Sequence, residues 1–357
     1  MGATTPGFVC AHHHLYSSLA RGMPAPTTTP KSFISILQQV WWRLDAALDL
    51  DMIYWSAKLG AVEALMSGTT CIIDHHESPN AISGSLATIR QACEEVGVRV
   101  NVAYGVTDRW QDDGTMLDAV EPSSPMTKAA RLGLEENRRE LVAGKTAMVG
   151  IHASFTVSDE TLSAACDLAD EFGVGVHIHV AEGPDDVSAT ERLESLARDN
   201  WLIIHGVHLK RSLRGVLVHN ARSNMNNSVG YANPHRSTMT IALGTDGIGA
   251  DMPEEARVAY ARLREQEVTA SANLIEGWIE NSRDLFPESR NDVVSWNYDN
   301  ADSIWHLMYT PGTRPLTVVA GGRTVLANGL PTLVDIAEVR HHAALHAKRL
   351  HERLAAA

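Results

Sequence analysis

Histidines and carboxylates that end apolar segments are the residues in this sequence best suited to chemistry. His12, His13 and His14 are adjacent at the end of one such segment. Side chains alternate faces along an extended strand, so His12 and His14 point to one side and His13 to the other. Two imidazoles in this spacing can bind one metal ion, although three adjacent histidines alone are also compatible with a tag or a polar loop. His179 and Asp246 end two later segments and supply the further nitrogen and oxygen ligands of a catalytic zinc or iron site.

Eight apolar segments rich in Val, Ile and Ala are predicted to be buried strands. Amphipathic helical patterns lie between most of them, for example over residues 51–66 and 128–143. Strands that alternate with helices run parallel, and eight of them predict a closed (β/α)8 TIM-like barrel rather than an open sheet. The short connection between the sixth and seventh segments fits this prediction least well, because it leaves room for only a turn or a short helix. The segments are 7–14, 69–76, 98–107, 147–156, 174–182, 201–209, 215–220 and 240–249.

A barrel places catalytic groups at the C-terminal ends of its strands, and the polar residues of this sequence follow that rule. The residues at these ends are His12, His14, Asp74, His75, His76, Thr107, Asp108, His179, Glu182, His205, Asn220, Arg222 and Asp246.

The remaining chain predicts a small second unit. Helices are expected near 253–265 and 274–286, followed by strands at 317–320 and 324–326 around a Gly321-Gly322 turn. We therefore divide the chain into a barrel (6–290), partial β-sandwich strands (291–335) and a C-terminal helix (336–357).

Composition favours a small-molecule enzyme. The 357 residues are 44% hydrophobic and 20% charged, and 30 basic against 43 acidic residues give a net charge of −13. This charge argues against nucleic acid or an anionic membrane as partner. Four cysteines without C-x-x-C spacing indicate reduced thiols, and with no apolar signal segment the chain is expected to be cytoplasmic.

Several motifs together resemble the amidohydrolase superfamily. They are the run from Pro6 to His14, His179-Val180-Ala181-Glu182, His205, the run Ser223-Asn224-Met225-Asn226-Asn227, and Gly244-Thr245-Asp246. Within that superfamily the chain is similar to the aminohydrolase branch that contains guanine deaminase and triazine hydrolases, and most of all to the SsnA aminohydrolase group. The resemblance spans residues 6 to about 335.

The resemblance implies one divalent metal ion, zinc or alternatively iron, on His12, His14, His179 and Asp246. Superfamily members with two metals usually carry a lysine on the fourth strand, but segment 147–156 contains none, which favours a single ion. A metal so held can lower the pKa of water enough to give hydroxide at neutral pH.

Three residues are expected to handle protons and the attacking water. Asp246 would accept the water's proton, and Glu182 would deliver a proton to a ring nitrogen. His205 would hold the water or the developing oxyanion. Their alternative roles are a solvated loop carboxylate for Glu182 and a core histidine for His205. His177 shares a face with His179 but lies deeper, so it is expected to be a packed core residue.

Substrate contacts are expected from side chains that stack on or hydrogen-bond to a flat nitrogen heterocycle. Trp41 and Trp42 are candidates for a cap over the pocket, with the alternative, more usual for adjacent aromatic residues, that one packs inward and the other contacts a partner. The Ser-Asn-Met-Asn-Asn run has the alternative of simply shaping its loop. The substrate-binding candidates are Tyr16, His76, Trp110, Arg222, Asn224 and Asn227, with His75 as a further one.

The expected function is hydrolytic removal of an exocyclic amine from a purine, pterin or triazine-like ring. The alternatives are a hydrolytic dehalogenase or another C–N hydrolase of the superfamily, and an inactive metal-binding or interaction protein. Family members usually have several strands before the position of Pro6, which this sequence is expected to lack. The partial sandwich would then have an unpaired edge that a second copy could cover in a homodimer.

Overall fold

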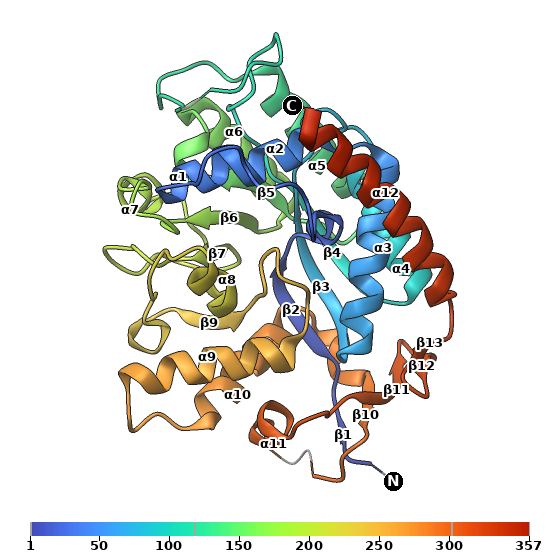
Figure 1. Ribbon diagram of the computed structural model, residues 1–357. Helices are drawn as coiled ribbons and strands as arrows, with labels where there is room; N and C mark the ends of the chain where they lie inside the picture. Colours follow the sequence, from blue (N-terminus) through green and yellow to red (C-terminus); the bar gives the residue numbers. More distant parts are fainter. Residues whose placement is uncertain (1, 118, 301–302, 357) are drawn as a thin grey trace.

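The computed structural model describes residues 2–117, 119–300 and 303–356, which form an α/β fold around a ring of parallel strands (Figure 1). Each of the eight segments predicted as strands contains one, so the chain forms the predicted (β/α)8 barrel. Nearly all residues of these strands are buried, which is why the segments are continuously apolar rather than alternating. The strands are β2 (Phe8–His13), β3 (Thr69–His76), β4 (Arg99–Tyr104), β5 (Val149–Ala153), β6 (Val176–Val180), β7 (Leu202–His205), β8 (Val216–His219) and β9 (Thr240–Leu243).

The ring consists of two parallel sheets joined at two seams. One sheet has the order β2-β3-β4 and the other β5-β6-β7-β8-β9. Parallel bridges from Val102 to Ala147 and from Val106 to Ile151 join β4 to β5. A bridge between His13 and Asp246 joins the first strand of the ring to the turn after the last. This second seam brings together predicted metal ligands that follow the first and the last strand of the ring.

Helices cover the outside of the ring. Several begin at a side-chain cap, as where Asp49 accepts a hydrogen bond from the backbone N–H of Met52 at 2.9 Å. Between β7 and β8 the connection forms turns, so the short spacing there fits the ring without a helix. No helix of the described residues is long and apolar enough to cross a membrane. The helices are α3 (Leu50–Met66), α4 (Ser85–Val96), α5 (Lys128–Val142), α6 (Asp159–Phe172), α7 (Ala189–Leu193), α8 (Ala221–Asn226), α9 (Met252–Gln266) and α10 (Ala272–Asp284).

The segment between β2 and α3 lies beside the C-terminal ends of β5 and β6 (Figure 1). It contains a 3-10 turn (Leu15–Ala20), α1 (Phe33–Ile36), a π-helical turn (Leu37–Trp41) and α2 (Trp42–Ala47). Wide π turns occur often at functional sites because they re-aim side chains within a helix. Here the turn sets the directions of the neighbouring residues Trp41 and Trp42, and we call residues 15–47 the covering segment.

A five-stranded antiparallel sheet lies at the other end of the barrel, with the order β1-β10-β11-β12-β13. Gly321 and Gly322 both have positive φ, 56° and 76°, as the predicted tight turn between β11 and β12 requires. The expectation of an unpaired edge is wrong at β10, because one short strand before Pro6, Thr4–Thr5, pairs with it. The strands are β1 (Thr4–Thr5), β10 (Val293–Trp296), β11 (Pro315–Ala320), β12 (Arg323–Ala327) and β13 (Leu330–Pro331).

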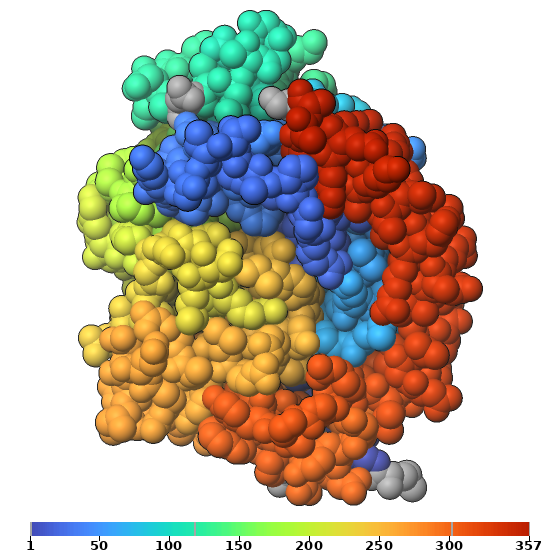
Figure 2. Space-filling view, viewed as in Figure 1, coloured from blue at the N-terminus to red at the C-terminus, as the bar shows by residue number. Residues whose placement is uncertain are grey.

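The C-terminal helix α12 (Ile336–Ala356) follows α11 (Ile304–Tyr309) and this sheet. It lies along α3, and Figure 2 shows its red surface beside the light blue of α3. Arg349 and Arg353 form ion pairs with Asp49 at 3.0 and 2.6 Å, so the helix is fixed to the N-terminal cap of α3. Ala357, the last residue of the predicted helical range, lies outside the described residues.

Candidate active site

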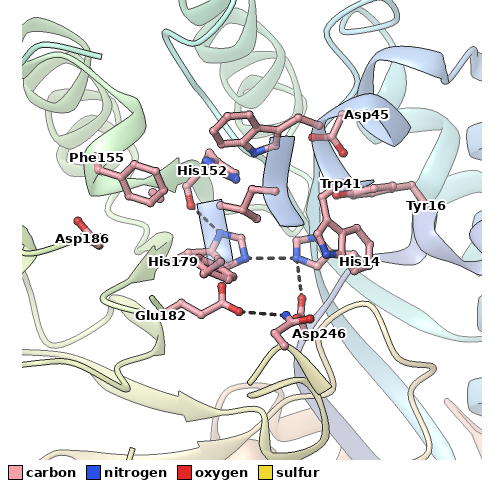
Figure 3. A pocket seen from close by; sticks show the side chains of 15 residues that line it. His14, Tyr16, Trp41, Asp45, His152, Phe155, His179, Glu182, Asp186 and Asp246 are labelled. Atoms are coloured by element: carbon pink, nitrogen blue, oxygen red, sulfur yellow. Dashed lines mark hydrogen bonds and ion pairs between the residues drawn. The ribbon is translucent and has the colours of Figure 1, made fainter. Parts of the chain in front are cut away.

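The four predicted metal ligands converge at the C-terminal ends of β2, β6 and β9. Figure 3 shows three of them, His14, His179 and Asp246. His14 Nε2 lies 3.0 Å from Asp246 Oδ1 and 3.2 Å from His179 Nε2. His12 Nε2 lies 3.5 Å from the same Asp246 oxygen. Three imidazole nitrogens and one carboxylate oxygen therefore face a common point, as alternation along β2 predicts.

Neighbouring carbonyl groups fix the tautomers of two of these histidines. His14 Nδ1 lies 2.6 Å from the carbonyl oxygen of His75, and His179 Nδ1 lies 2.5 Å from that of His152. A carbonyl only accepts, so both Nδ1 atoms carry a hydrogen and both Nε2 atoms are the ones that face the common point. Metal-binding histidines are commonly oriented by such an outer hydrogen bond.

His12 has a histidine as its orienting partner. Its Nδ1 lies 2.8 Å from Nε2 of His177, which is buried as predicted for a core residue. His12 Nε2 has no hydrogen-bond partner among the described residues, although the side chain is fully buried. A buried nitrogen without a partner is costly unless something else binds it, and a metal ion would satisfy it.

The charges at this point also fit a divalent cation. Burial lowers the pKa values of His12 and His179 well below the usual range, which keeps both neutral as metal ligands must be. The pKa of Asp246 is held well below its usual range because the hydrogen bonds and charges of the histidines outweigh its burial. For His14, the hydrogen bond and charge of Asp246 outweigh burial and raise the pKa to about 9. Without a metal ion, Nε2 of His14 therefore carries a proton, and this proton occupies the place of a cation beside Asp246. The residues present therefore fit a metal ion.

His13 lies off this face. Its Nδ1 is 3.0 Å from Thr245 Oγ1, on the side of the strand away from the predicted ligands. The alternation argument is confirmed for all three adjacent histidines.

Glu182 and His205 lie together beside the ligands. Glu182 Oε2 is 3.3 Å from His205 Nε2, and its Oε1 accepts a hydrogen bond from Asn227 at 3.3 Å. Burial raises the pKa of Glu182 to about 7, and the charge of Asp246 adds to this rise. His205 Nδ1 lies 2.7 Å from Asn224 Oδ1, which accepts its hydrogen and leaves the Nε2 lone pair toward the site. His205 also belongs to a group with His12, His179 and Asp246 whose ligand atoms lie within 4.8 Å of one another.

Unusual backbone conformations occur at the same place. His205 and Asp246 have positive φ values, 68° and 51°, in the left-handed region that non-glycine residues seldom adopt. His205 is the last residue of β7 and Asp246 lies in the turn after β9, and both side chains lie at the group of predicted ligands. Such backbone strain is concentrated at functional sites.

A pocket opens over this group, with a space of about 570 Å³ including its mouth. Ligand pockets usually have this size, with apolar walls and a few convergent polar groups. Trp41 and Trp42 line it, as expected of a cap. The lining residues are His14, Tyr16, Phe33, Leu37, Trp41, Trp42, Asp45, His152, Ala153, Phe155, His179, Glu182, Asp186, Asn227 and Asp246.

Two of the six predicted substrate-binding residues, Tyr16 and Asn227, line the pocket. The other four lie outside its lining. His76 Nε2 is 2.9 Å from the Ser78 hydroxyl, and Arg222 donates to Glu255 at 2.6 Å.

Asn224 orients His205, and Trp110 forms a bridge with Met116 in the loop after β4. Of the strand-end residues, Asp108 accepts backbone hydrogen bonds from Thr127 and Ser158, each at 2.8 Å, and is structural.

Sequence reasoning did not identify a buried charged cluster behind one wall of the pocket, formed by Asp45, Glu77 and Arg109. Arg109 contacts Glu77 directly, and its Nη2 lies 3.7 Å from Asp45 Oδ2. The guanidinium also lies over the ring of Trp42, 4.3 Å from its centroid. The position of Glu77 and Arg109 just after two strands is a signal that could have found them.

The amidohydrolase family profile matches residues 3–275. The chain belongs to the amidohydrolase family. The 5′-deoxyadenosine deaminase of Methanopyrus kandleri is 31% identical to this amidohydrolase over 71% of the chain and 60% of the relative. The 5-methylthioadenosine/S-adenosylhomocysteine deaminase of Aquifex aeolicus is 30% identical over 69% of the chain and 58% of the relative. The chain thus spans less than two thirds of the length of either relative.

Solved structures confirm the barrel of this amidohydrolase. An adenosine deaminase from Xanthomonas campestris, crystallised with bound zinc, matches with a TM-score of 0.77 at 19% identity, over 98% of this chain and 86% of that one. An atrazine chlorohydrolase from Arthrobacter aurescens, complexed with zinc, matches with a TM-score of 0.76 at 17% identity, over 96% and 88% of the two chains. At this identity the likeness concerns the fold.

Proposed function

We propose that this amidohydrolase is a metal-dependent deaminase that hydrolyses the exocyclic amine of a purine-type heterocycle. The observation that carries the proposal is the convergence of His12, His14, His179 and Asp246 beside the Glu182–His205 pair. Four of these six residues, His14, His179, Glu182 and Asp246, line one pocket. The names of the relatives, which are deaminases of adenine nucleosides, favour an adenine nucleoside among such rings.

Zinc is the proposed ion, on the four predicted ligands, because neutral imidazoles and a carboxylate suit it and because solved relatives hold zinc. Bound there, it would acidify a water molecule so that it can act as a nucleophile at neutral pH. Asp246 has one oxygen, Oδ2, that accepts a hydrogen bond from Ser223 and another, Oδ1, that faces the histidines. We assign Oδ1 to accept the proton that the water gives up.

Glu182 is assigned to carry a proton to the substrate. Its buried carboxyl group has a pKa of about 7, so both its protonated and ionised forms are populated near neutral pH. Asn227 and His205 hold its two oxygens in place. In the reaction a C–O bond forms from water and the C–N bond to the amine breaks. One proton of the water ends on the ring nitrogen of the product, and the other leaves with the amine as ammonia.

Aromatic side chains on several elements suit a flat heterocycle. Tyr16, Trp41, Trp42 and Phe155 line the pocket above the ligands and offer ring faces for stacking. In Figure 3, Trp41 and Tyr16 lie on one side of the histidines and Phe155 on the other. A planar ring between them would lie next to Glu182 at its lower edge.

The test is ammonia release by zinc-loaded protein over adenosine, 5′-deoxyadenosine, guanine, pterins, cytosine and aminotriazines. We expect at least one amino-substituted ring to be converted and the conversion to stop when a chelator removes the ion. Chloride release from a chlorotriazine without any ammonia release would favour a dehalogenase, the alternative suggested by the chlorohydrolase fold relative. Stoichiometric metal without any turnover would favour the inactive metal-binding alternative.

A further inference from the structure

The pocket presents carboxylates and no free cationic side chain. Asp45, Glu182, Asp186 and Asp246 line it, and among the residues the structure describes neither a lysine nor an arginine does so. Glu182 and Asp246 belong to the reacting end. Asp186 is engaged by the Ser154 hydroxyl and, at 2.8 Å, by the backbone N–H of Ala181. This leaves Asp45 at the other end of the pocket, above the histidines in Figure 3.

Arg109 contacts Asp45 but does not line the pocket, and its charge is compensated although its Nη1 has no hydrogen-bond partner among the described residues. The residue is 1% exposed and lies between Glu77 and Asp45. Two carboxylates therefore surround one guanidinium. Whether they hold one proton between them or none, the net charge of the trio Asp45, Glu77 and Arg109 is zero or negative.

The trio also has spare capacity to accept hydrogen bonds. Asp45 is 2% exposed, and burial raises the pKa of its carboxyl group although the Tyr16 hydroxyl interacts with it and lowers that pKa. Its Oδ1 has no partner in good hydrogen-bond geometry in the described part of the chain. Glu77 Oε1 is likewise without one, 3.6 Å from Nε2 of His152. A buried carboxylate oxygen that lines a pocket without a donor is costly, and a donor group of a ligand would satisfy it.

We propose that the trio Asp45, Glu77 and Arg109 makes the pocket selective by charge, so that it admits heterocycles whose substituent is neutral or cationic and excludes those that carry an anionic group there. The inference rests on the proposed function, because it takes the amine of the ring to lie at Glu182 and the substituent to lie toward Asp45. An anionic substituent would lie beside Asp45 in a buried site where no lysine or arginine of the described chain lines the pocket to pair with it, and like charges repel strongly there.

Three nucleosides that differ only at the 5′ position test the proposal on the parent protein. They are 5′-amino-5′-deoxyadenosine, a cation at pH 7.5, neutral adenosine, and the anionic adenosine 5′-carboxylic acid. We expect kcat/KM for the anion to be at least about 10-fold below that for adenosine, and the cation to equal or exceed adenosine. Binding of the same three compounds to zinc-loaded protein, measured by calorimetry, should follow the same order.

The double variant Asp45→Asn with Glu77→Gln locates the effect in the trio. It keeps the size and hydrogen bonding of both side chains but leaves Arg109 as the single charge. The ratio of kcat/KM for the anion to that for adenosine should rise about 10-fold or more. The matched control is Asp170→Asn with Glu171→Gln, which removes two carboxylates from exposed ion pairs on α6 and should leave the ratio unchanged.

The order of the three binding affinities measured by calorimetry distinguishes failure of this inference from failure of the proposed function. If no compound is deaminated but binding follows the charge order, the proposed function falls and the charge selection stands. If all three are deaminated and bound equally well, or if the cation does not bind, the charge selection is overturned. If the parent discriminates but the double variant does so equally, the trio is not its source. Circular dichroism and zinc content establish that the double variant is folded.

Discussion

Three adjacent histidines at the end of β2 have three different surroundings. His12 faces the common point from full burial, and His14 reaches it from the residue after the strand. His13 instead faces Thr245 on the opposite side. The contrast between His13 and the other two follows from the alternation of side chains along the strand, so replacement of His13 should give a different result from replacement of a ligand.

We expect His14→Ala and Asp246→Ala to abolish stoichiometric zinc binding and activity together. His13→Ala should keep about one zinc per chain, because its side chain does not face the ligands. Elemental analysis of the purified proteins measures this. Equal metal loss in all three variants would mean that the strand register is different, and two ions per chain in the parent would contradict a mononuclear site.

Glu182 is proposed to move a proton and not to hold the metal. Glu182→Gln keeps the hydrogen bond with Asn227 but cannot titrate, so zinc content should stay near that of the parent. Turnover of a substrate that the parent deaminates should fall by roughly 10²- to 10⁴-fold, as is typical when a general acid–base is lost. Near-normal turnover would move the proton-transfer role to His205 or Asp246.

Asp74 is a buried carboxylate whose ionisation should destabilise the fold. Burial raises its pKa to about 7, although the backbone N–H of Leu15 donates to it at 2.7 Å. The unfolded chain loses this proton near pH 4. Between about pH 4 and pH 7 the folded state therefore binds more protons than the unfolded state, and the free energy of unfolding falls as pH rises.

Asp74→Asn removes this dependence while its amide oxygen can still accept from Leu15. The variant should be more stable than the parent above pH 7, by up to about 4 kcal/mol relative to the difference at pH 4. Urea unfolding across this pH range measures it. Parallel stability curves for the two proteins would show that Asp74 is ionised throughout.

At the scale of elements, burial decided what could be predicted from the sequence. All eight strands were found because each lies inside the ring and must be apolar, and β3 matches its predicted segment residue for residue. The covering segment has no such periodicity. Asp45 reaches the pocket only through the π turn before α2, a feature that no hydrophobic pattern encodes.

The same reason explains the substrate-binding residues that lie outside the pocket. A position at a strand end places a residue near the site, but the hydrogen-bond partner of its side chain decides where that side chain points. Arg222 turns to the buried Glu255 on α9, a partner distant in sequence. His76 turns to Ser78, and Asn224 to His205. These choices depend on tertiary contacts that strand spacing does not reveal.

Replacement of Gly150 tests how closely β4 packs against β5. A Cβ atom there would collide with the backbone carbonyl of Tyr104, which cannot move without opening the seam. Gly150→Ala should destabilise the fold by about 1–3 kcal/mol, the usual result of overpacking. Gly277→Ala at an exposed position of α10 is the matched control, since nothing lies within 4 Å of the added atom, and it should stabilise by about 0.5–1 kcal/mol. Thermal unfolding of both variants distinguishes these outcomes.

At the scale of the whole molecule, metal binding should stabilise the barrel. The ligands come from β2, β6 and the turn after β9, and a cation that binds the folded state alone adds stability through mass action. Zinc at about 100 times its dissociation constant should raise the free energy of unfolding by about 2.7 kcal/mol, seen as a higher Tm that a chelator reverses. The Tm of His14→Ala should not respond to zinc. A zinc response in that variant equal to the parent's would place the stabilising ion elsewhere.

The bridge between His13 and Asp246 also constrains when the barrel can close during synthesis of the chain. Domains fold from the N-terminus as a chain is synthesised. During synthesis His12 and His14 emerge early, yet β2 has its second neighbour in the ring only after Asp246 has emerged. A growing chain can therefore offer two imidazoles to zinc long before it can offer the full ligand set. Tight zinc capture would then mark the moment at which the ring is complete, and a chain interrupted before Asp246 would leave the edge of β2 open.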